Sequence, residues 1–127
     1  MKTIQKITLD SDVVHNIISF AHANHPKEFI AILEGQLKED ELVITGLIYQ
    51  PYHSSHKTSI MRLNLPPFSH AVGSVHSHPS GTNIPSMQDL EFFGKNGIVH
   101  MIISYPYGKE DIGCYDSGGQ SIVFNLR

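Results

Sequence analysis

One stretch of the chain, residues 71–89, reads AVGSVHSHPSGTNIPSMQD and combines a strand, a loop and the start of a helix. Its pattern predicts a strand over Ala71–His76 that leads directly into two histidines. Pro79 ends that strand because proline has no amide hydrogen to donate to a sheet. A loop over Pro79–Pro85 and a helix over Ser86–Lys95 follow, and Asn96-Gly97 stops the helix, as glycine commonly does.

The polar residues of this unit form a candidate ligand set for a metal. His76 and His78 are two residues apart near the end of a strand, so their side chains project from the same face. Asp89 lies in the first turn of the helix, and a short loop allows the helix start to return to the end of the strand. Two neutral imidazoles and one carboxylate suit Zn²⁺, and three protein ligands leave the fourth tetrahedral position open for water. We therefore expect one Zn²⁺ per chain, bound by His76, His78 and Asp89 in a catalytic arrangement.

Each half of this pattern also has a purely structural interpretation. Ser86-x-x-Asp89 is a capping box, in which Ser86 caps the helix and Asp89 occupies its third position. An isolated His-x-His pair is more often a pair of surface or core residues than a pair of ligands. The two halves together, with an intervening proline and a loop of workable length, favour the metal site.

Other three-ligand zinc sites do not fit the sequence. The amidohydrolase type also uses His-x-His, but on a barrel of about 250 residues, and this chain has 127. The zinc deaminase signature needs Pro-Cys-x-x-Cys, and the chain has one cysteine. The zincin motif His-Glu-x-x-His does not occur.

The rest of the chain predicts an α/β fold: a single domain over residues 1–127, built on a mixed β-sheet flanked by helices. Apolar residues at helical spacing predict a helix that Asp10 or Ser11 caps and that runs to about Asn24, where Asn24-His25-Pro26 stops it. Further strands are expected over Thr3–Leu9, Glu28–Glu34, Leu42–Tyr49 and Ile98–Tyr105, the last of them buried, with a turn at Gly35 after the second. A polar loop over Pro51–His56 and an edge strand over Thr58–Leu63 are expected between Leu42–Tyr49 and the histidines. Gly113–Tyr115 and Ser121–Phe124 are expected to form a closing hairpin.

Composition narrows the functional classes. The net charge is −3 with histidine neutral, which argues against a nucleic-acid partner. The longest apolar runs, such as Phe29–Leu33, are far shorter than a membrane span, and the first residues have no signal-peptide apolar core. The lone Cys114 excludes an intramolecular disulfide. Together, these features lead us to expect a cytoplasmic protein without a membrane partner.

His76-Ser77-His78-Pro79 with Ser86-x-x-Asp89 resembles the JAMM (MPN+) zinc metalloprotease motif. Glu28, in the segment His25-Pro26-Lys27-Glu28, matches the glutamate that the family carries upstream. The resemblance implies the JAMM/MPN (cytidine-deaminase-like) fold, with Glu28 as general base and Ser86 as the residue that stabilises the oxyanion. It covers about Val13 to Tyr115, and the absence of a long insertion after the Asp89 helix makes the chain similar to minimal archaeal and other prokaryotic members.

What the family implies is hydrolysis after the C-terminal glycine of ubiquitin or a ubiquitin-like modifier, often at an isopeptide bond. An extended substrate tail is then expected along a sheet edge, with Thr58–Leu63 as the candidate. Two alternatives stay open: a peptidase that trims the C-terminal extension of a sulfur-carrier protein, and a non-catalytic binding scaffold. The intact set of Glu28, His76, His78 and Asp89 argues against the scaffold. The oligomeric state is not readable from the sequence.

The remaining histidines and the cysteine are expected to be structural. His53 and His56 are expected in an exposed loop rather than at a second metal. His100 lies within a buried strand and is expected to be a hydrogen-bonded core residue or a partner of a metal ligand. Cys114 is expected to be packed in a strand. Four further histidines are expected to be surface residues: His15, His22, His25 and His70.

Overall fold

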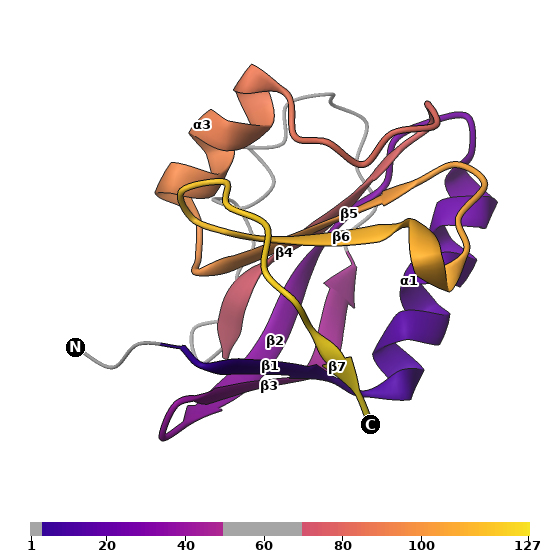
Figure 1. The fold of residues 1–127 in the computed structure, drawn as a ribbon. Helices are drawn as coiled ribbons and strands as arrows, with labels where there is room; N and C mark the ends of the chain where they lie inside the picture. Colours follow the sequence, from indigo (N-terminus) through magenta and orange to yellow (C-terminus); the bar gives the residue numbers. More distant parts are fainter. Residues whose placement is uncertain (1–3, 50–69) are drawn as a thin grey trace.

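The computed structural model describes residues 4–49 and 70–127. In this part of the chain, seven strands form one sheet in the order β6-β5-β4-β2-β3-β1-β7 (Figure 1). The elements are β1 (Lys6–Leu9), α1 (Ser11–Asn24), β2 (Ile30–Lys38), β3 (Glu41–Tyr49), β4 (Ala71–His78), α3 (Met87–Lys95), β5 (Val99–Ser104), a 3₁₀ turn η1 (Lys109–Asp111), β6 (Ile112–Asp116) and β7 (Asn125–Leu126).

The sheet is mixed, and its one β-α-β crossover in the described residues carries the candidate ligands. β2 pairs antiparallel with both β3 and β4, and β5 pairs antiparallel with β6. β4 and β5 are parallel and are connected through α3, while β1 runs parallel to β3 and β7. In such units, ligands bind beyond the carboxyl ends of parallel strands. His78, the last residue of β4, lies at such an end.

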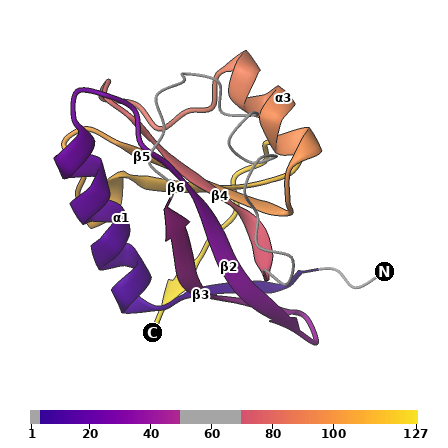
Figure 2. The same ribbon diagram turned by 180° about the vertical axis from the view of Figure 1, so that it is seen from behind.

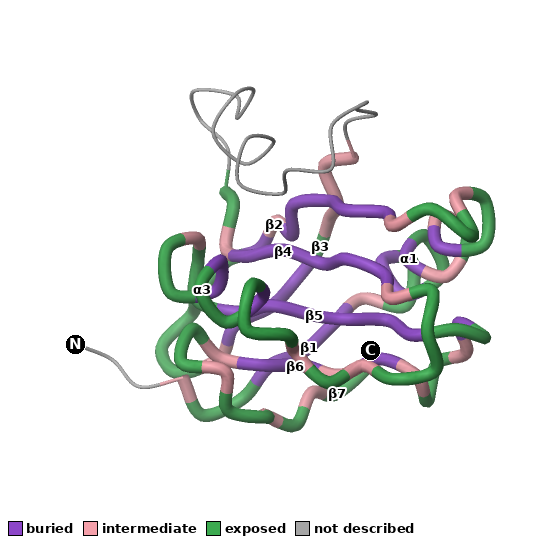
Figure 3. Tube along the Cα trace, turned by 90° about the horizontal axis from the view of Figure 1, so that it is seen from above, coloured by how far each residue is buried: buried purple, intermediate pink, exposed green. Residues whose placement is uncertain are grey.

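The two faces of the sheet bury two different apolar clusters, because successive side chains of a strand alternate between faces. α1 packs against one face and α3 against the other (Figure 2). The α1 cluster includes Val13, Ile17, Ala21, Phe29, Ala31, Leu33, Val75, Met101 and Ile103. The α3 cluster consists of Ile30, Ile32, Phe92, Phe93, Ile102 and Tyr115. Buried residues therefore follow β2, β4 and β5 through the middle of the molecule (Figure 3).

The expected helix over residues 11–24 is present as α1. It buries Val13, Val14, Ile17 and Ala21, which recur at helical spacing. The amide of His25 still donates to the Ala21 carbonyl, and Pro26 then prevents the helix from continuing. The expected helix over Ser86–Lys95 and the expected strands around β3, β4 and β5 are also confirmed, with ends that differ by one or two residues.

The expected turn at Gly35 is wrong. β2 continues through Gly35 to Lys38, and the chain reverses at Glu39 instead, which has a positive φ of 57°. The register with β3 shifts between Glu34 and Gly35, so the glycine marks a β-bulge rather than a turn. A Cβ added at Gly35 would lie 2.3 Å from the carbonyl oxygen of Val43, so only glycine permits this close approach of the two strands.

The expected closing hairpin is also largely wrong. Gly113–Tyr115 lies in β6, but the residues after the turn form a single bridge, between Tyr115 and Ser121, and no second strand. The chain instead runs on to β7, which pairs with β1. Ser121–Phe124 contains only three apolar residues in a row, and so short a run does not specify which strand it pairs with. The expected loop Pro51–His56 and edge strand Thr58–Leu63 lie outside the described residues.

Among the residues that the structure describes, neither helix has the length and apolar character needed to cross a bilayer.

His100 is a core residue, as expected. Its side chain is fully buried, its Nδ1 lies 2.7 Å from the Ser74 hydroxyl, and its ring stacks on Phe93 at a centroid distance of 4.4 Å. Burial lowers the pKa of His100 from 6.5 to about 4, because the interior disfavours the charged ring. The folded chain therefore keeps this histidine neutral at pH values where an unfolded chain would protonate it.

This burial predicts a specific dependence of stability on pH. Between pH 6.5 and about 4 the unfolded chain binds a proton at His100 that the folded chain does not, so lowering the pH favours unfolding. His100→Asn keeps a polar group near Ser74 but cannot titrate. From pH 7 to pH 5, urea unfolding should show the wild type losing roughly 2 kcal/mol more stability than the variant. If the free energy of unfolding fell equally with pH in the two proteins, His100 would not be a neutral core histidine.

Candidate metal centre

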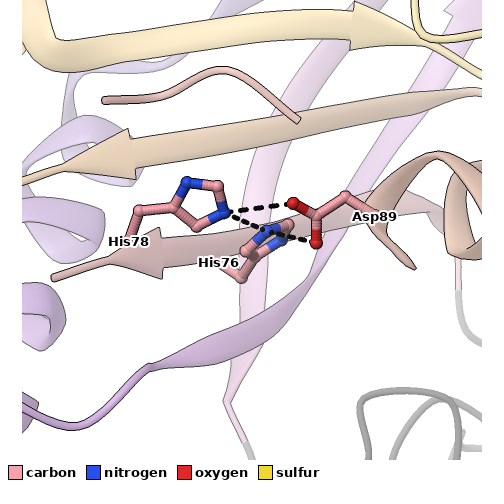
Figure 4. Close-up of side chains that lie close together, drawn as sticks. All are labelled: His76, His78 and Asp89. Atoms are coloured by element: carbon pink, nitrogen blue, oxygen red, sulfur yellow. Dashed lines mark hydrogen bonds and ion pairs between the residues drawn. The ribbon is translucent and has the colours of Figure 1, made fainter. Parts of the chain in front are cut away.

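The end of β4 and the start of α3 bring three candidate ligands together. His76 and His78 extend from the same face of β4, the face that α3 covers, and Asp89 extends toward them from the first turn of α3 (Figure 4). The side chains of His76 and Asp89 are fully buried, and that of His78 is 14% exposed. One edge of the cluster is therefore open to solvent, beside His78.

The distances within this cluster fit a single tetrahedral metal ion. His76 Nε2 lies 3.1 Å from Asp89 Oδ1, and His78 Nε2 lies 3.1 Å from Asp89 Oδ2. The two Nε2 atoms lie 3.2 Å apart. Zinc bonds to nitrogen and oxygen of about 2.0–2.2 Å place tetrahedral ligands about 3.3 Å apart. One ligand atom from each of the three residues lies within 4.8 Å of the other two, so the three side chains can share one ion. In the described part of the chain, these residues are the one such group of three.

His78 is oriented through its second ring nitrogen. Its Nδ1 lies 3.0 Å from the carbonyl oxygen of Thr82 and donates to it, which leaves Nε2 to face His76 and Asp89. The hydrogen bond to Asp89 raises the pKa of His78, against an opposing effect of burial. Metal binding requires the neutral ring, so a bound ion replaces a proton at Nε2.

Asp89 serves the helix and the ligand cluster at the same time. Its Oδ2 accepts a hydrogen bond from the Ser86 amide at 2.9 Å, and the Ser86 hydroxyl accepts one from the Asp89 amide at 3.1 Å. The capping box is thus present in full. The same carboxylate lies at 3.1 Å from both histidines, so the structural and metal-site interpretations of Ser86-x-x-Asp89 hold together rather than excluding each other.

The loop between the two halves of the site is held by residues that the sequence analysis missed. The side chain of Asn83 donates to the Asp111 carbonyl at 3.1 Å, and the Tyr115 hydroxyl donates to the Asn83 carbonyl at 2.7 Å. These bonds tie the loop to η1 and β6, so that the start of α3 returns to the end of β4. Tyr115 is 32 residues from Asn83, and no local pattern in the sequence marks the pair.

Strand register brings Glu28 to the same site. The pairing of β2 with β4 ends at Ile30 opposite His76, and the Ser77 amide donates to the Phe29 carbonyl just beyond it. Glu28 precedes Phe29 and therefore lies close to the end of β4. Glu28 is half-buried. The hydrogen bond to Asp89 is the main cause that raises the pKa of His78, and the charge of Glu28 adds a smaller effect in the same direction. The structure therefore gathers Glu28, Ser86 and the three candidate ligands at one end of β4.

The other sequence candidates lie away from this cluster. Cys114 is buried in β6, and burial raises its pKa to about 12, so its thiol is not poised to react. His15, His22, His25 and His70 are exposed, as expected. His25 lies with its Nδ1 2.7 Å from the Tyr107 hydroxyl. His53 and His56 lie outside the described residues.

Comparison with known proteins identifies the family. The family model for prokaryotic homologs of the JAB domain matches residues 10–115. This chain belongs to that family. A protein of Haloferax volcanii named "Probable metalloprotease" is 32% identical over an alignment of 126 residues. The match covers 90% of this chain and 75% of the relative.

Solved structures agree with this assignment. A JAB1/MPN domain protein from Archaeoglobus fulgidus is 31% identical, with a TM-score of 0.74 over 94% of this chain and 97% of the other. A structure described as "JAMM: A Metalloprotease-like Zinc Site in the Proteasome and Signalosome" is also 31% identical, with a TM-score of 0.72 over 98% and 99%. A solution structure from Desulfitobacterium hafniense, 20% identical with a TM-score of 0.67 over 95% and 92%, shares the fold.

These findings confirm the resemblance and the expected fold class, a mixed sheet with flanking helices of the JAB1/MPN type. Together with the geometry of His76, His78 and Asp89, they support one Zn²⁺ as the cofactor of this chain.

Metal analysis of ligand variants tests the cluster directly. The purified wild type should hold about one zinc per chain, whereas His78→Ala and Asp89→Asn should lower zinc affinity by more than about 100-fold, since even outer-shell changes cost 10–100-fold. Asp89→Asn keeps an oxygen for the Ser86 amide, so its helix cap should survive. His15→Ala, at an exposed position of α1, is the control. Full zinc content in either ligand variant, by elemental analysis, would contradict the assignment.

Proposed function

We propose that residues 1–127 form a single-domain zinc peptidase that hydrolyses the bond after the C-terminal glycine of a ubiquitin-like modifier in the cytoplasm. The proposal is supported most by the position of Glu28, two residues before β2, beside the end of β4 where His76 and His78 face Asp89. A metal cluster alone is compatible with a structural role. A hydrolytic site needs, in addition, a carboxylate that lies near the ligands but does not bind the ion.

In this proposal His76, His78 and Asp89 hold the ion, and Glu28 moves the proton. Zinc, when bound, would polarise the scissile carbonyl and lower the pKa of a water toward about 7. The Glu28 carboxylate accepts a proton from the attacking water and then donates it to the nitrogen of the leaving amine. Half-burial suits this role, because a Glu28 side chain beside the open edge of the cluster stays within reach of the substrate.

Ser86 is proposed to stabilise the negative oxygen that forms when water attacks the carbonyl carbon. Its hydroxyl oxygen accepts the hydrogen bond of the Asp89 amide, which leaves the O–H hydrogen able to donate. Ser86 is exposed and adjoins the ligand cluster through Asp89. A serine can therefore cap the helix and donate to an oxyanion with the same side chain.

A substrate panel tests the function and its rivals. The zinc-loaded protein should cleave ubiquitin-like conjugates at an isopeptide bond, and a chelator should abolish the cleavage. Release of the extension from a sulfur-carrier precursor, without cleavage of conjugates, would assign the alternative peptidase function. Binding to either protein without cleavage, at full zinc occupancy, would favour the scaffold and contradict the peptidase.

Glu28→Gln separates the proton carrier from the ligands. The amide keeps the size of the side chain but cannot accept a proton, so turnover should fall by about 100-fold or more while zinc content stays near one per chain. Mass spectrometry of the zinc-loaded variant and a rate assay on the same sample check both. Turnover close to that of the wild type would show that Glu28 has another role.

Ser86→Ala separates capping from catalysis. Loss of the cap alone should cost roughly 1 kcal/mol of stability and leave the turnover of the folded enzyme unchanged. Loss of an oxyanion donor should lower turnover by about 100-fold with zinc still bound. We expect both effects together, measured as the urea midpoint and the rate constant of one preparation. A destabilised variant with full activity would leave Ser86 as a cap only.

A further inference from the structure

Ser77, the residue between the two candidate histidine ligands, has a structural environment unlike theirs. Its side chain points to the opposite face of β4, under α1, and the residue is fully buried. Its hydroxyl oxygen accepts a hydrogen bond from the Phe29 amide at 2.8 Å. Its own amide donates to the Phe29 carbonyl at 2.9 Å. One residue therefore binds both backbone polar groups of Phe29.

This pair of bonds departs from an ordinary sheet ladder. In a hydrogen-bonded antiparallel pair, each residue donates its amide to the carbonyl of the other. The pair of Phe29 and Ser77 comes directly after the pair of Ile30 and His76 in the register of β2 and β4. The amide of Ser77 makes the expected bond, to the Phe29 carbonyl. The amide of Phe29, however, donates to the serine hydroxyl. A side chain thus takes the place of a backbone acceptor where β2 begins.

The position of this bond matters because the Phe29 amide belongs to the peptide unit that starts at Glu28. A planar peptide held at its nitrogen fixes the orientation of the preceding Cα, from which the Glu28 side chain extends. Ser77 is also covalently joined to His76 and His78. The bond therefore ties the backbone of Glu28 to the same short segment that carries two ligands.

We propose that Ser77 is a positioning residue: its hydroxyl holds the Glu28–Phe29 peptide so that the Glu28 carboxylate faces His78 and the substrate. The inference rests on the proposed function, in which Glu28 carries the proton. A general base must lie within hydrogen-bonding reach of the water, and displacement by about 1 Å can cost about 100-fold in rate. A serine that only satisfied a buried amide would affect stability but not turnover.

Three variants of Ser77 and one control separate these roles. Ser77→Ala removes the acceptor, Ser77→Cys keeps a similar size with a weak acceptor, and Ser77→Thr keeps the hydroxyl. The control is Thr8→Val, which deletes a buried hydroxyl of β1 that donates to Glu41 at 2.7 Å and is remote from the site. Each zinc-loaded protein is assayed for kcat, KM, zinc content and urea midpoint, and amide exchange at Phe29 is followed by NMR.

Ser77→Ala and Ser77→Cys should lower kcat by about 10- to 100-fold with KM within about twofold and zinc retained, and Ser77→Thr should restore most of kcat. Thr8→Val should lower the midpoint without lowering kcat. If Ser77→Ala does not fold, Ser77→Cys decides the outcome. Wild-type kcat in a folded Ser77→Ala or Ser77→Cys protein would overturn the proposal, as would a loss that the threonine does not restore.

The exchange measurement keeps this proposal distinct from the proposed function. If the wild type cleaves nothing in the panel, the function fails, but the Phe29 amide should still exchange about tenfold faster or more in Ser77→Ala than in the wild type and Ser77→Thr. Crystal structures of the same proteins should then show the Glu28 carboxylate displaced from His78 in Ser77→Ala alone. An unchanged Glu28 with an unprotected Phe29 amide would overturn the positioning role by itself.

Discussion

The register between β2 and β4 is the constraint on which the site depends, because it places Glu28, two residues before β2, beside the end of β4 that carries the histidines. Side chains alternate along a strand, so a slip of one residue would turn Glu28 to the face that α1 covers and leave the histidines on the other. The position of β4 is limited on its far side as well. A Cβ at Gly73 would lie 1.6 Å from the Val99 carbonyl oxygen of β5, so the two parallel strands meet where no other residue fits. The central three strands thus set the distances at the site.

Asp89 shows how a buried charge is kept at little structural cost. Its side chain is fully buried, yet the carboxylate accepts the Ser86 amide and faces two imidazoles. A buried carboxylate without such partners would be costly, since it would lose its hydration without replacement. The start of a helix adds the positive end of the helix dipole to this compensation. Capping and ligand geometry therefore use one arrangement of atoms, and neither interpretation of the motif had to be given up.

Much of the fold follows from local patterns, and the errors have a common cause. The helical spacing of Val13, Ile17 and Ala21 predicted α1, and Pro26 predicted its end. The same reasoning failed at Gly35, where a glycine serves a bulge that only the approach of β3 explains. It failed again after Tyr115, where the chain leaves β6 to pair with β1 from the other end of the sequence. Both errors concern the partner of a strand, which short-range periodicity does not encode.

The candidate site divides in the same way. The sequence by itself determined the chemistry: two imidazoles on one face of a strand and a carboxylate at a helix start are a zinc-binding set, because residue type and spacing decide which donor atoms are available and how they are directed. Only the tertiary structure decided how that set is held. The carbonyl of Thr82 orients His78, the bonds of Asn83 return α3 to β4, and Ser77 binds the peptide next to Glu28. These contacts join segments that are distant in the chain or use backbone atoms that every residue has, so no residue pattern reveals them until strand pairing brings them together.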